Sequence, residues 1–122
     1  MRGIAEYKTV ALESSDQREL VVLCFEALIR RQEQAKKAIN DGRYMEAIEA
    51  VRIAREIYCE LLLAIDQDAA PEMGTNLASL YDWCIRMLAT VGQRYDVAVL
   101  EQTLSVTKTL HEGFCTAFNE AE

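Results

Sequence analysis

The sequence is poor in the residues that interrupt secondary structure. Its 122 residues include a single proline, Pro71, and 5 glycines. Because proline and glycine punctuate helices and strands, so few of them predict a small number of long elements. No stretch shows the polar and apolar alternation of a half-buried strand, so the sequence predicts an all-α protein.

Zinc ligands are scarce as well. The chain has one histidine, His111, and 4 cysteines with no Cys-x-x-Cys pair, namely Cys24, Cys59, Cys84 and Cys115. Each cysteine lies within an apolar helical pattern, so we expect reduced core residues rather than a disulfide framework or zinc ligands. A di-iron or haem bundle would need Glu-x-x-His pairs or paired axial ligands, which one histidine cannot supply. We predict no metal and no cofactor.

Catalytic motifs are missing too. No nucleophile and base pair and no glycine-rich phosphate loop is present, so we predict no enzyme activity. A histidine phosphotransfer domain is also a four-helix bundle with one reactive histidine. Its pattern places lysine and glycine three and four residues after the histidine, where this chain has Phe114 and Cys115. We instead expect His111 to be partly buried and hydrogen-bonded to a neighbour.

Positive charge and long apolar runs are both limited. The chain has 13 basic and 20 acidic residues, a formal net charge of -7. This argues against nucleic acid and anionic membranes, because both bind clustered Lys and Arg. No run of about 18 apolar residues could span a bilayer, and the segment 1–8 lacks the apolar run of a signal peptide. We therefore expect a cytoplasmic protein.

Four segments show helical periodicity. Ser14, Ser15 and Asp16 provide cap oxygens for a first helix that runs to about Asn40, and Gly42 can adopt the left-handed conformation that ends it. The second helix is predicted from Tyr44 to about Asp66. Pro71 suits the first turn of a third helix, Gly92 is its expected stop, and Asp96 can cap a fourth.

Apolar residues recur at spacings of three and four in each segment. The predicted core residues are Leu20, Leu23, Cys24, Ala27, Leu28, Ala35, Ala38 and Ile39; Ala47, Val51, Ala54, Tyr58, Leu61 and Ile65; Leu77, Tyr81, Cys84, Leu88 and Val91; and Val97, Leu100, Leu104, Thr107, His111, Phe114 and Phe118, with Val99, Thr103, Val106 and Leu110 as a competing set in the fourth segment. Long helices with short connections predict an antiparallel four-helix bundle over residues 15–120. Residues 1–14 are expected to form a short N-terminal extension that packs on it.

The second and third segments carry more apolar residues than one packing stripe needs. The additional residues are Ile48, Ile57 and Leu62 in the second segment, and Leu80, Ile85 and Met87 in the third. A small protein with apolar side chains to spare usually buries them against a partner.

The order and spacing of these residues resemble the FliS-type flagellar secretion chaperones over nearly the whole chain. The resemblance is carried by Tyr7, the segment from Ser15 to Leu23, Asn76-Leu77-x-x-Leu80-Tyr81-Asp82 with Arg86-x-Leu88, and Tyr95-Asp96-Val97. The chain departs from the family at Cys24-Phe25-Glu26-Ala27, where Leu-Tyr-Asp-Gly is usual, and at Asp16, where proline is common. These changes conserve volume or capping chemistry and bear on partner preference more than on the fold.

The resemblance implies a cytoplasmic export chaperone that binds the disordered C-terminal segment of flagellin, prevents premature polymerisation and aids flagellar type III secretion. The extension would act as a displaceable lid. The implied flagellin contacts are Ile4, Tyr7, Ile48, Leu62, Leu77, Leu80, Tyr81 and Met87. For Leu77 and Tyr81, packing within the bundle is an equal alternative. Other flagellar export components are further partners, and we expect a monomer or weak homodimer; a generic helical-bundle adaptor remains the alternative function.

Overall fold

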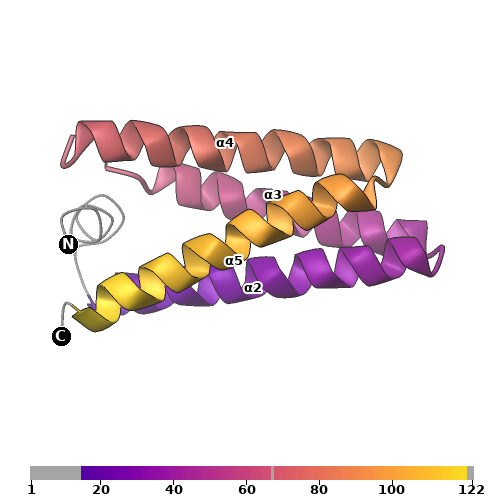
Figure 1. Cartoon of the computed structure of the whole chain (residues 1–122), viewed down its shortest axis with the longest axis horizontal. Helices are drawn as coiled ribbons and strands as arrows, with labels where there is room; N and C mark the ends of the chain where they lie inside the picture. Colours follow the sequence, from indigo (N-terminus) through magenta and orange to yellow (C-terminus); the bar gives the residue numbers. More distant parts are fainter. Residues whose placement is uncertain (1–14, 67, 121–122) are drawn as a thin grey trace.

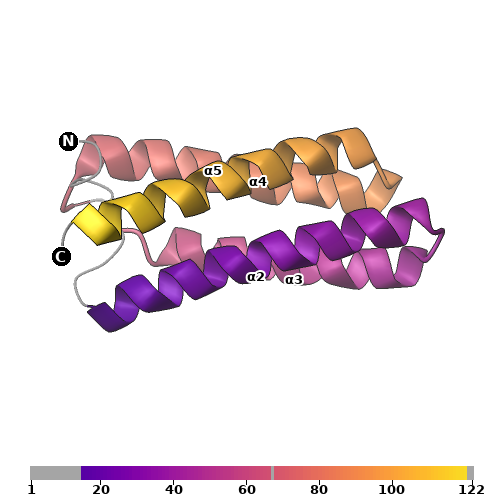
Figure 2. The same ribbon diagram turned by 60° about the horizontal axis from the view of Figure 1, so that its bottom comes forward.

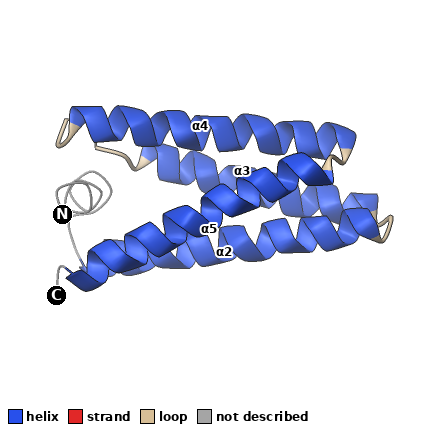
Figure 3. Ribbon diagram, viewed as in Figure 1, coloured by secondary structure: helices blue, strands red, loops and turns tan. Residues whose placement is uncertain are grey.

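The computed structural model describes residues 15–66 and 68–120, which form four α-helices. These are α2 (Ser15–Asn40), α3 (Tyr44–Leu63), α4 (Pro71–Arg94) and α5 (Val97–Glu120). Both α2 and α4 pack against α3 and α5, so the four helices close into a ring (Figure 1). Successive helices run in opposite directions (Figure 2) and are joined by short turns (Figure 3). The predicted antiparallel four-helix bundle is confirmed.

The turn from α2 to α3 has the geometry that glycine permits. Gly42 adopts a left-handed conformation with φ 75°. Its N–H donates to the carbonyl of Ile39 at 3.1 Å, and the N–H of Arg43 donates to the carbonyl of Ala38 at 2.8 Å. These two bonds form a Schellman motif, which satisfies carbonyls at the end of α2. The predicted stop at Gly42 is confirmed.

The second helix ends earlier than its periodicity predicts. We expected it to reach Asp66, but α3 ends at Leu63. The Asp66 carboxylate instead accepts hydrogen bonds from the N–H groups of Asp68 and Ala69, at 3.1 and 3.3 Å. Aspartate side chains that bind nearby backbone in this way compete with helix formation.

Gly92 is not the stop of the third helix, so that prediction was wrong. Helix α4 continues to Arg94, and Tyr95 takes the left-handed position with φ 55°. A Cβ atom placed on Gly92 would lie 3.6 Å from Cγ1 of Val51, an ordinary van der Waals distance, so α4 packs against α3 at this position. The predicted cap of α5 is confirmed, because Oδ1 of Asp96 accepts from the N–H of Val99 at 3.2 Å.

The predicted core stripes of α3 and α4 are buried, apart from Ile65, which lies beyond α3 and is partly buried. In α5, residues from both predicted sets of core positions are buried. Its buried residues are Leu100, Thr103, Leu104, Thr107, Leu110, Phe114, Ala117 and Phe118, whereas Val97 and His111 are only partly buried.

The predicted phase of α2 was wrong in its first turns. Leu20 and Leu23 are 60% and 54% exposed. The buried residues of α2 are Val21, Phe25, Leu28, Gln32, Ala35 and Ala38. Since residues 20–25 are all apolar, their spacing could not choose between neighbouring phases. Packing decides it, because the ring of Phe25 lies 5.2 Å from that of Phe114 and 6.4 Å from that of Tyr81.

A polar network joins three helices inside the core. Nε2 of Gln32 in α2 donates to Oγ1 of Thr107 in α5 at 2.8 Å, and the Thr107 hydroxyl donates to the carbonyl of Thr103 at 2.8 Å. The hydroxyl of Tyr58 in α3 lies 2.5 Å from Oγ1 of Thr107. Because the single proton of Thr107 is already donated, Tyr58 is the donor of that bond.

Candidate functional site

A groove runs along the bundle surface between α3 and α4. It is lined by Ile48, Val51, Arg52 and Arg55 from α3, and by Leu88, Ala89, Gly92 and Gln93 from α4. Val51 and Leu88 are buried beneath it, whereas Ile48 is 39% exposed. Because α4 contributes the small residues Ala89 and Gly92, the groove keeps a volume of about 290 Å³ and is open to solvent.

Exposed apolar residues also lie at the start of α3, close to the groove. Tyr44 precedes Ile48 by one helical turn, and its ring lies 4.4 Å from that of Tyr95. Tyr44 is 46% exposed and the adjacent Met45 is 84% exposed. The left-handed backbone of Tyr95 is unfavourable for a residue other than glycine, and the ring contact offsets part of that cost. This aromatic pair therefore lies one helical turn from Ile48, at the end of the groove.

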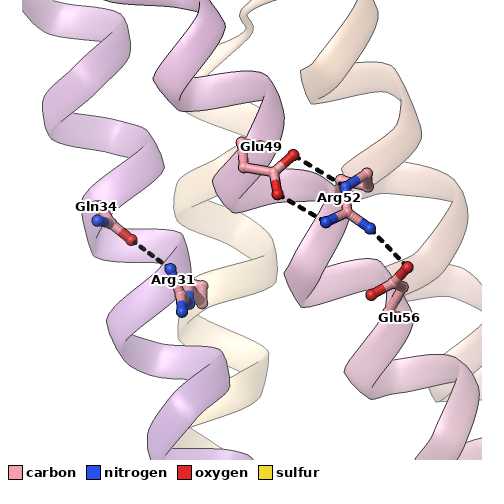
Figure 4. A network of polar contacts seen from close by, with 5 residues as sticks. All are labelled: Arg31, Gln34, Glu49, Arg52 and Glu56. Atoms are coloured by element: carbon pink, nitrogen blue, oxygen red, sulfur yellow. Dashed lines mark hydrogen bonds and ion pairs between the residues drawn. The ribbon is translucent and has the colours of Figure 1, made fainter.

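The two arginines of the groove differ in their partners. Arg52 lies between two carboxylates, with nitrogens at 2.6 and 2.9 Å from Glu49 and at 2.6 Å from Glu56 (Figure 4). The hydrogen bond from Arg52 lowers the pKa of Glu49. Arg55 has no such partner, since its buried Nε atom makes no hydrogen bond within the described residues.

A family model described as flagellar protein FliS matches residues 1–121 of the chain. The chain belongs to the FliS family. It is similar to two proteins named flagellar secretion chaperone FliS. The relative in Salmonella typhimurium is 27% identical over 117 residues, which cover 92% of this chain and 87% of the relative. The relative in Escherichia coli is 22% identical over 121 residues, which cover 93% and 87%.

The fold also matches a solved structure, described as the crystal structure of a flagellar chaperone from bacteria. The TM-score is 0.80 at 20% sequence identity, and the match covers 88% of this chain and 87% of that one. At this identity the match supports the fold alone. The FliS family and the bundle architecture therefore rest on independent comparisons.

The residues that the FliS resemblance implies for flagellin binding fall into separate groups. Ile48 lines the α3–α4 groove. Leu62 follows Ile48 by two heptads on the same flank of α3 and is partly buried against the core. Ile4 and Tyr7 lie outside the described residues.

Leu80 and Met87 lie on the other flank of α4. Met87 and Ala89 stand on either side of the buried Leu88 in sequence. Because successive residues of a helix are about 100° apart, Met87 and Ala89 lie on opposite flanks of α4. Ala89 lines the groove with α3. Met87, together with Leu80 one heptad earlier, is therefore on the flank towards α5, and both are partly buried.

Leu77 and Tyr81 are both 2% exposed. The ring of Tyr81 lies 5.7 Å from that of Tyr58 and 6.4 Å from that of Phe25. These two residues therefore pack within the bundle, and a ligand would reach them only if the helices moved apart.

His111 and the cysteines lie away from the groove or beneath it. Nε2 of His111 is 3.6 Å from Sγ of Cys115 and 4.0 Å from Oε2 of Glu26, and His111 is partly buried as expected. Burial raises the pKa of Cys84 to about 11 and also raises the pKa of Cys115. These thiols stay protonated at neutral pH, which disfavours nucleophilic chemistry.

Cys59 corrects the expectation that all four cysteines are core residues. It is exposed, Cys84 is buried, and Cys24 and Cys115 are partly buried, all as free thiols. Over residues 15–66 and 68–120, no three His, Cys, Asp or Glu side chains are grouped so that they could hold a metal ion. Nor is any helix there both long and apolar enough to cross a membrane.

Arg55, Ala89 and Gly92 also line the groove, although none of them was predicted as a site residue. A signal for Arg55 was present, because Ile48, Arg55 and Leu62 are spaced by seven and share one flank of α3. No comparable signal marks Ala89 and Gly92. A small residue in a helix can line a groove or lie where two helices pack closely, and the sequence does not distinguish these two situations.

Proposed function

We propose that this protein is a cytoplasmic flagellar export chaperone that binds the disordered C-terminal segment of flagellin in the α3–α4 groove. Bound in this way, the segment is prevented from premature polymerisation and is kept available for type III secretion. Membership of the FliS family over residues 1–121 supports the role. The groove between α3 and α4, with the exposed Ile48 at its lining and the Tyr44–Tyr95 pair one turn away, is the observation that carries the site.

The physical basis of binding is coupled folding of an amphipathic segment. A disordered client loses conformational entropy when it becomes helical, at a cost of about 1 to 2 kcal/mol per ordered residue for the backbone. Burial of its apolar face must exceed that loss. The partly exposed Ile48 and the small residues Ala89 and Gly92 together allow the apolar side of a helix to lie close to α3 and α4.

The other implied contacts have distinct places in this proposal. Leu62 extends the site along α3, while Leu80 and Met87 form a second contact surface on the α5 side of α4, which a client that wraps around α4 would reach. We assign Ile4 and Tyr7 to a lid that the client displaces. Leu77 and Tyr81 act indirectly, by shaping the bundle beneath the client. The free protein is a monomer or weak homodimer.

The test is titration calorimetry of the full chain with a peptide of the C-terminal flagellin segment from the same organism, with circular dichroism in parallel. We expect saturable one-to-one binding, a gain of helix and a negative heat-capacity change. Ile48→Glu should weaken binding at least tenfold, because it places a charge at the groove opening, where the client would bury it.

Leu23→Glu is the matched control, since it adds the same charge to an exposed apolar residue of α2, a helix that contributes no residue to the groove. It should retain binding within about threefold. Equal losses in both variants would place the client elsewhere. The absence of binding by folded wild-type protein at micromolar concentrations would overturn the proposed function itself.

A further inference from the structure

Arg55 is a cation in the groove with a buried donor that has nothing to bind. Its Nε atom is buried and makes no hydrogen bond with any described residue. No ion pair within residues 15–66 and 68–120 includes Arg55, whereas Arg52 in the same helix binds both Glu49 and Glu56. Burial of an unpaired guanidinium donor is costly, so a turn of the side chain that brings this nitrogen to an acceptor bound in the groove would remove an existing penalty.

No acid lies one helical turn from Arg55 in either direction along α3. Its helical neighbours three and four residues away are Val51, Arg52, Tyr58 and Cys59, none of which is a carboxylate. Across the groove, α4 presents Leu88, Ala89, Gly92 and Gln93. No described residue that lines the groove is acidic, although the chain as a whole carries a net charge of -7.

Acids do border Arg55 on the outward face of α3. An open hollow of about 710 Å³ there is lined by Arg55, Glu56 and Glu60, among other residues of α3. Glu56 is already bound to Arg52. Because none of the groove-lining residues is acidic and Arg55 forms no ion pair, a carboxylate in the groove would not have to displace an acid from it.

We propose that Arg55 binds a carboxylate on the client helix that occupies the α3–α4 groove, and thereby selects clients with an acidic residue at a defined position. This inference rests on the proposed function. A guanidinium pairs with a carboxylate through two parallel hydrogen bonds, which sets orientation as well as affinity. Ile48 and Arg55 are seven residues apart in α3, or about 10 Å. We therefore expect a client helix aligned with the groove to carry an apolar residue that contacts Ile48 and, about seven residues away, an acid that binds Arg55.

The test is a double-mutant cycle measured by titration calorimetry. The protein variants are Arg55→Met, which keeps the aliphatic stem, and Arg55→Lys, which keeps the charge but loses the fork. The probes are the C-terminal flagellin peptide from the same organism and a set of peptides in which each Asp or Glu is changed singly to Asn or Gln. Arg86→Met is the matched control, because Arg86 binds Asp82 on the exposed face of α4.

We expect Arg55→Met to weaken binding of the unchanged peptide about tenfold or more, Arg55→Lys to weaken it less, and Arg86→Met to leave it within twofold. One peptide substitution should cause the same loss, with no further loss when it is combined with Arg55→Met. The inference would be overturned if the losses in affinity multiplied when the protein and peptide changes were combined. It would also be overturned if Arg55→Met bound the peptide as tightly as the wild type. If Ile48→Glu still abolished binding in that case, the proposed function would stand.

Discussion

Thr107 uses its whole hydrogen-bonding capacity inside the core. Its hydroxyl donates to the carbonyl of Thr103 and accepts from Gln32 and Tyr58. Burial raises the pKa of Tyr58, so its hydroxyl stays protonated and remains a donor. Every hydrogen-bonding group of the Thr107 side chain is therefore used. By contrast, Oε1 of Gln32 accepts no hydrogen bond from any described residue.

Thr107→Val should destabilise the bundle by about 2 to 4 kcal/mol, because it removes the acceptor of the buried Tyr58 hydroxyl and of one hydrogen of the Gln32 amide, whose Nε2 keeps only its bond to the Leu28 carbonyl. Urea denaturation followed by circular dichroism would measure the change in the free energy of unfolding. Thr109→Val is the control, since Thr109 is exposed and its hydroxyl donates only to the carbonyl of Ser105. A loss below about 1 kcal/mol in Thr107→Val would contradict the assigned role of the network.

Two residues of this network show what apolar periodicity can predict and what it overlooks. Thr107 was predicted for the core from its heptad position, and it is buried. Gln32 was not predicted, although it is fully buried. A pattern that counts apolar residues overlooks a polar residue whose partner lies on a helix 75 positions away.

At the scale of the helices, two glycines have opposite effects on stability. Gly42 ends α2 with a φ of 75°, which other residues adopt at a cost. Gly113 lies within α5, and no atom would meet a Cβ added there within 4 Å. Gly42 adopts a left-handed backbone conformation that other residues avoid, whereas Gly113 only lowers the stability of its helix.

Gly42→Ala should therefore destabilise the protein by about 1 kcal/mol or more, and Gly113→Ala should stabilise it by about 0.5 to 1 kcal/mol. Thermal unfolding of the two variants beside the wild type would measure both effects under one set of conditions. A destabilising Gly113→Ala would mean that a close neighbour excludes the methyl group, contrary to the open space found there.

At the scale of the whole molecule, the four helices close a ring in which each contacts two others. Helices α4 and α5 lie close at the turn that joins them and diverge towards the start of α4 (Figure 1). The single tryptophan, Trp83, is partly buried against the core on the α5 side of α4. It reports on the part of the ring where these two helices separate.

We expect one cooperative unfolding transition, because each helix relies on two neighbours to cover its apolar face. Trp83 fluorescence and far-ultraviolet circular dichroism should give the same midpoint in a urea titration. An earlier fluorescence midpoint would show that α5 separates from α4 while the rest of the helices persist.

The candidate site was predictable in part. The apolar excess of the second and third helices was visible in the sequence, and Ile48 does line the groove. The sequence did not show that Leu80 and Met87 lie on the opposite flank of α4 from that groove. Which flank faces which neighbour depends on the order of helices around the ring, and that order is not a local property.

The sequence by itself determined four helices, their caps at Gly42 and Asp96, and the buried stripes of α3 and α4, because these follow from local periodicity and backbone preference. Only the tertiary structure decided the phase of α2, where Phe25 rather than Leu23 is buried, and the position of Gly92 against α3. It also decided that Arg55 enters a groove without an acid. Each of these depends on contacts between residues far apart in the chain, which arise only when the helices pack.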